Sequence, residues 1–139
     1  MKWIVRNIHR IMTVSGVLTL TMLYAVVAPE AALQSTFGES ISGPVADIVV
    51  RNWGALIGLI GVMLIYAARK PAVRAMTLVI AGTSKAVFGA LVLSHGGRFL
   101  SQQAGIAVAV DLLWVALFAA YLWSPRREAV DIAAPAGTL

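Results

Sequence analysis

The sequence predicts an all-α integral membrane protein, folded as a four-helix bundle with an up-down-up-down arrangement. Two observations support this class. Of the 139 residues, 60% are hydrophobic and only 12% are charged, whereas soluble domains carry about a quarter charged residues. Four apolar segments, each near the ~20 residues that cross a bilayer as a helix, use most of the chain. Helices satisfy their own backbone hydrogen bonds, which lipid requires.

The four predicted helices cover residues 11–27, 45–68, 75–94 and 104–123, and the first would start as early as Trp3 if its basic end lies among the lipid headgroups. Proline follows the first, second and fourth segments, and Gly96-Gly97 follows the third. We expect one membrane domain over residues 1–127 and a disordered tail over residues 128–139. Residues 30–37 are expected to form a short surface helix. Basic residues precede the first apolar segment as in a signal peptide, but three more spans follow, so we expect a retained helix.

Basic residues set the expected orientation, because loops rich in Lys and Arg stay in the cytoplasm. Eight of the 11 would lie on one side of a four-span topology: Lys2, Arg6, Arg10, Arg69, Lys70, Arg74, Arg126 and Arg127. We therefore expect a bacterial inner-membrane protein with both termini in the cytoplasm. An aromatic belt is expected at the same interface, formed by Trp3, Tyr66, Tyr121 and Trp123.

Several classes of function are disfavoured. The absence of cysteine excludes disulfides, thiolate metal sites and cysteine nucleophiles. Two well-separated histidines predict neither a metal site nor haem, and the flanking position of the basic residues argues against nucleic acid. Walker, Gly-x-Ser-x-Gly and HExxH motifs are missing. Whether the protein is an enzyme stays open.

Away from the ends of the predicted spans, three charged residues lie within them: Arg51, Lys85 and Asp111. At a helix centre each costs ~2.5–3.5 kcal/mol, so such residues face the bundle interior and form pairs. At 1.5 Å per residue, Lys85 lies roughly 13 Å and Asp111 roughly 10 Å from the outer ends of their helices. A Lys85–Asp111 pair would lower both costs. It would serve either a structural role or binding and proton handling, unless Lys85 extends to the outer surface.

The helical spacing places these residues on faces rich in small side chains. Asp47, Arg51, Gly54, Gly58 and Gly61 form one stripe, and Gly82, Lys85 and Gly89 share a face of the next helix. Such glycines permit close helix packing, either within the monomer or between two copies. Asp47 and Arg51 alternatively form only an ion pair at the start of the helix. His95 and Arg98 would lie at the outer mouth, where they could contact an anion or a headgroup.

The chain resembles the DoxX-like superfamily, and within it small four-helix bacterial membrane proteins of unknown function. The resemblance covers about residues 10–123 and rests on Ala28-Pro29-Glu30, Arg51-Asn52-Trp53-Gly54-Ala55, the basic turn Ala67-Ala68-Arg69-Lys70-Pro71, and Asp111 in an apolar run. It implies the four-helix fold, with links in some members to quinone-associated redox steps. Lys85 departs from the pattern, in which an Arg nearer the outer end is more usual.

Together these features predict a membrane protein that binds a lipophilic ligand or a membrane partner through Arg51, Lys85 and Asp111. The ligand would be a quinone or a bound lipid, without metal or haem. Three alternatives stay open: an accessory subunit with internal salt bridges, a membrane enzyme on a lipophilic substrate, and a small dimeric transporter. The expected partners are the lipid bilayer and either another membrane protein or a second copy.

Overall fold

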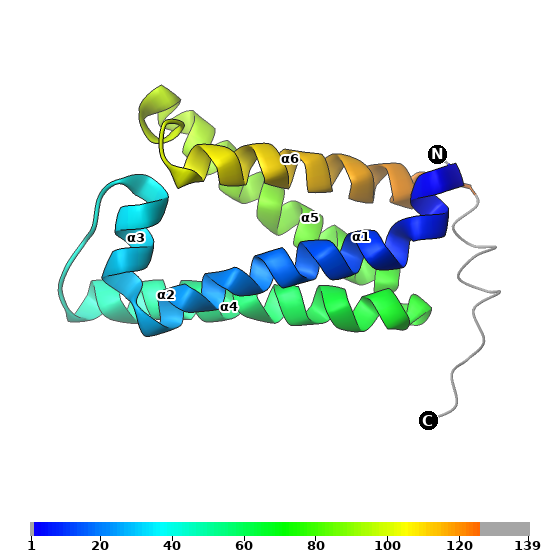
Figure 1. The fold of residues 1–139 in the computed structure, drawn as a ribbon, viewed down its shortest axis with the longest axis horizontal. Coiled ribbons are helices and arrows are strands. Elements are labelled where there is room, and N and C mark those ends of the chain that lie inside the picture. The colour runs from blue at the N-terminus through cyan, green and yellow to red at the C-terminus, as the bar shows by residue number, and fades with distance from the viewer. Residues whose placement is uncertain (1, 126–139) are drawn as a thin grey trace.

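The computed structural model describes residues 2–125, and the regular elements in this part of the chain are all helices (Figure 1). Four helical segments are long and apolar enough to cross a membrane: Lys2–Val27, Pro44–Arg69, Pro71–Ser94 and Gln103–Leu122. The first comprises α1 (Lys2–Leu20), the 3₁₀ turn η1 (Thr21–Leu23) and α2 (Tyr24–Val27), and the others are α4, α5 and α6. The predicted all-α membrane bundle is confirmed. The predicted tail lies outside the described residues.

Two helices begin earlier than the sequence pattern predicted. Helix α1 begins at Lys2 rather than near residue 11, which agrees with the alternative start near Trp3, and its basic first turns are helical as well. Helix α5 begins at Pro71, where the sequence indicated only the end of the preceding helix. Proline suits the first position of a helix, since its missing N–H would have no intrahelical partner there. Pro44 starts α4 in the same way.

The four spans run alternately up and down (Figure 1). Helix α1 packs along α4, α5 packs along α6, and α4 contacts α5. The start of α1, the turn between α4 and α5, and the end of α6 lie together at one end of the bundle. We call this the basic end, after Arg6, Arg10, Arg69 and Lys70, and the opposite end the α3 end.

Arg74, expected in a loop, lies instead in the first turn of α5 and is only 5% exposed. Its guanidinium donates a hydrogen bond to the carbonyl oxygen of Ala68, 3.2 Å away, at the end of α4. The last carbonyls of a helix have no intrahelical donors, and a basic side chain can supply one. Arg74 therefore joins α4 to α5 at the basic end.

The glycine stripe of α4 packs against the first span of the same chain. A Cβ on Gly61 would lie 2.8 Å from the carbonyl oxygen of Gly16, and a Cβ on Gly16 would lie 2.8 Å from that of Gly61. A Cβ on Gly54 would lie 2.9 Å from the Cβ of Ala25, and Gly58 lies directly against Leu23. These glycines allow the two backbones to touch. The stripe is therefore occupied by packing within the monomer.

The glycines of α5 do not have the predicted packing role. A Cβ on Gly82 would lie 3.8 Å from Phe118, and one on Gly89 would lie 3.9 Å from Val108. Both distances are ordinary van der Waals contacts, so α5 and α6 do not need glycine there. By contrast, a Cβ on Gly105 would collide with the carbonyl oxygen of Leu100, a requirement that the sequence pattern did not reveal.

The main hydrophobic core lies in the half of the bundle near the basic end. Its largest fully buried side chains come from all four spans: Ile8, Met12, Leu64, Leu78, Phe118 and Tyr121. The expectation that Tyr121 belongs to an interfacial belt is therefore wrong, because its side chain is fully buried in this core. Trp3, Tyr66 and Trp123 are exposed, as a belt requires.

Helix α3 (Pro29–Phe37) crosses the opposite end of the bundle, next to the start of α6 (Figure 1). It ends at Gly38, whose positive φ of 74° is a conformation that favours glycine. The predicted helix over residues 30–37 is thus present. One of its faces is buried, because Ala32 packs in a small cluster with Ala25 and Val50.

Candidate ligand-binding cavity

An ion pair joins α5 and α6 inside the bundle. The ammonium nitrogen of Lys85 donates a hydrogen bond to Asp111 Oδ1 at 2.6 Å. The two side chains are only 11% and 17% exposed. Each helix thus contributes one charge that would be costly alone in an apolar interior. The predicted pairing is confirmed, and the alternative in which Lys85 extends to the surface is wrong.

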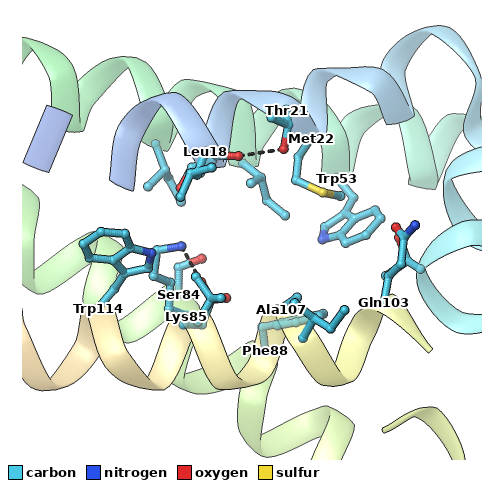
Figure 2. Close-up of a pocket in the computed structure, with 17 residues that line it drawn as sticks. Leu18, Thr21, Met22, Trp53, Ser84, Lys85, Phe88, Gln103, Ala107 and Trp114 are labelled. Atoms are coloured by element: carbon cyan, nitrogen blue, oxygen red, sulfur yellow. Dashed lines mark hydrogen bonds and ion pairs between the residues drawn. The ribbon is translucent and has the colours of Figure 1, made fainter. Parts of the chain in front are cut away.

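The pair forms part of the wall of a cavity of about 480 Å³. This size is typical of sites for small organic ligands, which are concave and mostly apolar. Figure 2 shows Leu18, Met22 and Trp53 facing Lys85 and Ala107 across the space. The cavity therefore lies between the α1–α4 pair and the α5–α6 pair, towards the α3 end. The half of the bundle near the basic end is filled by the hydrophobic core instead.

The lining of the cavity is mainly apolar, and it includes three aromatic side chains. Trp53 comes from α4, Phe88 from α5 and Trp114 from α6. Trp114 also stacks on Phe118, with ring centroids 6.4 Å apart, which links the cavity wall to the core. Aromatic rings offer a ligand large, rigid surfaces at low entropic cost.

Phe37, the last residue of α3, gathers three rings at the α3 end of the cavity. Its ring centroid lies 6.3 Å from Trp53, 6.5 Å from Phe88 and 5.6 Å from Phe99. These separations fall within the range of favourable aromatic pairs. The cluster ties α3 to α4, to α5 and to the turn after α5, so α3 covers this end of the cavity.

Several hydrogen-bonding groups in the cavity are available to a ligand. Within residues 2–125, the Lys85 ammonium donates a single hydrogen bond, to Asp111. An ammonium can donate three, so two donors remain for a ligand. Asp111 Oδ2, Ser84 and Gln103 have no recorded protein partner within the same range. Thr19 and Thr21 use their hydroxyls on backbone carbonyls of their own segment.

Arg51 does not join the predicted cluster. Its Nε donates to both carboxylate oxygens of Asp47, at 3.0 and 2.8 Å, and its Nη1 donates to the carbonyl oxygen of Val26. Arg51 is not among the cavity-lining residues, and its side chain is 43% exposed. The spacing placed Arg51 on the packed face, but α2 ends there and offers a free carbonyl. The reading of Asp47 and Arg51 as an ion pair at the helix start fits this geometry.

The residues expected at the outer mouth are also engaged elsewhere. His95 follows the end of α5, and its Nδ1 lies 2.9 Å from the carbonyl oxygen of Leu91 in the last turn of that helix. Arg98 forms an exposed ion pair with Glu39, and its guanidinium lies 5.4 Å from the ring centroid of Phe99. His95, Arg98 and Asp47 do not line the cavity. Within residues 2–125, the His, Asp and Glu side chains form no group of three suited to a metal.

The aromatic walls were not identified as site residues from the sequence. Trp53 could be placed only near one end of its span, and Trp114 and Phe88 resemble core or lipid-facing residues. A signal was nevertheless present for two of them. Trp114 follows Asp111 by three positions and Phe88 follows Lys85 by three, so each aromatic side chain shares a helix face with a charge.

The fold and the cavity together define the class of protein, a small helical membrane protein with four spans and an internal polar pair. Comparison with known proteins adds no relative, because no family model, curated protein or solved structure matches the chain. The resemblance to the DoxX-like superfamily therefore rests on the residues alone.

Proposed function

We propose that this protein binds a lipophilic ligand, quinone-like or lipid-like, in the cavity between its two helix pairs. Lys85 donates hydrogen bonds to the polar group of the ligand, and Asp111 balances the charge of Lys85. Trp53, Phe88 and Trp114 hold the apolar part of the ligand. Arg51, which is engaged with Asp47 and Val26, has no direct role in binding.

The observation that carries the proposal is the position of the ion pair on the wall of the cavity. A pair that served only to fix the two helices would be enclosed by packed side chains, which would satisfy or exclude its remaining hydrogen-bonding groups. Here the ammonium and the carboxylate border about 480 Å³ of space. Spare donors and acceptors beside apolar walls are the usual features of a ligand site.

We also propose the bacterial inner membrane as the location, with the N- and C-termini in the cytoplasm. The grouping of Arg6, Arg10, Arg69 and Lys70 at one end of the bundle supports this orientation. Membership of the DoxX-like superfamily is part of the same proposal and is supported by the residues quoted for it.

The accessory-subunit alternative predicts a protein without a ligand. The dimeric-transporter alternative is less favoured, because the glycines of α4, its best interface, pack on the first span of the same chain instead. Ser94 Oγ lies 3.3 Å from His95 Nδ1, but both residues are exposed and do not line the cavity, so this contact does not favour the enzyme alternative over binding.

Native mass spectrometry of protein extracted gently from its own membrane tests the proposal. We expect a small lipophilic mass to remain bound to the wild type and to be lost in Lys85→Met. Arg51→Met is the matched control, because it removes a basic side chain outside the cavity, and it should retain the mass. A bare protein, or one with only bulk phospholipid in every variant, would favour the accessory role.

A further inference from the structure

The charges that line the cavity restrict the ligand further, provided that the proposed binding function holds. Lys85 and Asp111 are the ionisable residues among the cavity-lining side chains of the described chain. We propose that the cavity selects an uncharged lipid with a hydroxyl-bearing head over an anionic lipid of the same chain length.

The charges on the cavity wall balance each other. With Arg51 held outside by Asp47, the cavity wall carries one positive and one negative charge, 2.6 Å apart. An anionic head that reached Lys85 would also approach the Asp111 carboxylate. In a site screened poorly by water, that repulsion is strong, and the complex would retain a buried net charge. An uncharged head avoids both costs.

The polar pair offers a ligand both a hydrogen-bond donor and a hydrogen-bond acceptor. The Lys85 ammonium has donors to spare, and Asp111 Oδ2 is an acceptor without a recorded partner among residues 2–125. A hydroxyl group is both donor and acceptor, so one hydroxyl can accept from Lys85 and donate to Asp111. A bare carbonyl could use only the first of these, and a carboxylate could not donate at all.

Some of the apolar side chains that line the cavity are exposed. Leu18 on α1 and Ile106 on α6 both line the cavity, and they are 49% and 69% exposed. These two side chains form an apolar part of the rim, beside the exposed Thr21 and Gln103, and we infer that this part meets lipid in a membrane. An alkyl chain can pass this rim directly from the bilayer, without crossing water, while the head reaches the polar pair.

Tryptophan quenching by a matched pair of brominated lipids tests the selectivity. One probe is dibromostearic acid, at a pH where its carboxyl is ionised, and the other is its uncharged glycerol monoester. The protein carries Trp3→Phe and Trp123→Phe, which remove two exposed tryptophans and leave Trp53 and Trp114 as reporters in the cavity wall. We expect saturable quenching by the ester, with an affinity at least about tenfold above that of the carboxylate, a difference of about 1.4 kcal/mol.

Asp111→Asn gives the sharper result, since it leaves the cavity with a net positive charge. We expect the carboxylate probe to gain affinity and the preference to shrink or reverse. Gln103→Lys is a second variant at an exposed, cavity-lining position that leaves the ion pair intact, and it should shift the preference in the same direction. Equal or tighter binding of the carboxylate to the unaltered pair would overturn the proposal.

The outcomes separate this inference from the proposed function. If neither probe quenches, but the extracted wild type carries a lipophilic mass that Lys85→Met loses, the selectivity proposal is wrong and ligand binding stands. If neither probe quenches and the extracted protein is bare, both are wrong. If both variants leave the preference for the ester unchanged, the charge of the pair does not select the ligand.

Discussion

The ammonium of Lys85 on α5 lies 2.6 Å from the Asp111 carboxylate on α6, although the two residues are 26 positions apart in the chain. The short connection between these helices, with the 3₁₀ turn η2 (Gly96–Phe99), brings them side by side and sets the two charges at the same depth. The pair therefore fixes the register of α5 against α6, and it also places two charges on the wall of the cavity.

Removal of one partner should destabilise the protein. Asp111→Ala leaves the Lys85 ammonium without its counter-ion in a mostly buried position, and we expect a loss of about 3 kcal/mol, since breaking buried pairs costs about 3–5 kcal/mol. Denaturant or thermal unfolding in detergent measures the change. Lys85→Met combined with Asp111→Leu should recover most of this loss. Additive losses in the double variant would mean that the two residues do not act as a pair.

Substitution of Gly61 tests the packing of α4 on α1. We expect Gly61→Ala to destabilise by about 1–3 kcal/mol, the usual cost of overpacking, because its new Cβ would meet the backbone of Gly16. Gly82→Ala is the matched control, since its Cβ would lie 3.8 Å from Phe118. It should leave stability within about 0.5 kcal/mol. Equal effects on the thermal midpoint would rule out this packing arrangement.

Arg51 should matter little for stability. Its ion pair with Asp47 is about half exposed, and pairs of this kind contribute about 0–1 kcal/mol. We expect Arg51→Met to shift the unfolding midpoint far less than Lys85→Met does. A loss comparable to that of Lys85→Met would place Arg51 among the residues that hold the bundle together.

The proposed orientation can be checked with single cysteines, because the chain has none of its own. Ser42→Cys lies in the connection after α3, and Ala72→Cys lies in the first turn of α5 at the basic end. In intact bacterial cells with a permeabilised outer membrane, a membrane-impermeant maleimide should label the first and not the second. The reverse labelling pattern would invert the topology.

The sequence was sufficient for the fold and for the central pair. Apolar length predicted the four spans, and the cost of isolated charges in lipid predicted that Lys85 and Asp111 would meet. The position of the Arg51 side chain could not be predicted, because helical spacing does not show that the carbonyl oxygen of Val26 lies within reach of its guanidinium. Nor could the sequence reveal the cavity, which depends on how two helix pairs diverge.

Tyr121 illustrates the same limit. Position along the helix placed it near an interface, but only the packing of the four spans decides whether such a ring faces lipid or the core. Gly82 and Gly89 have the correct spacing for close packing, yet α6 does not approach them closely. Spacing identifies a face of a helix, and the neighbouring helix determines how that face is used.

The most direct test of ligand binding fills the cavity without altering its charges. Ala107→Phe places a ring in the cavity, and Ala109→Phe makes the same change two residues further along α6, at an exposed position. In native mass spectrometry of gently extracted protein, we expect the bound lipophilic mass to be lost from Ala107→Phe and kept by Ala109→Phe and the wild type. The same mass on all three proteins, or on none, would contradict binding in this cavity.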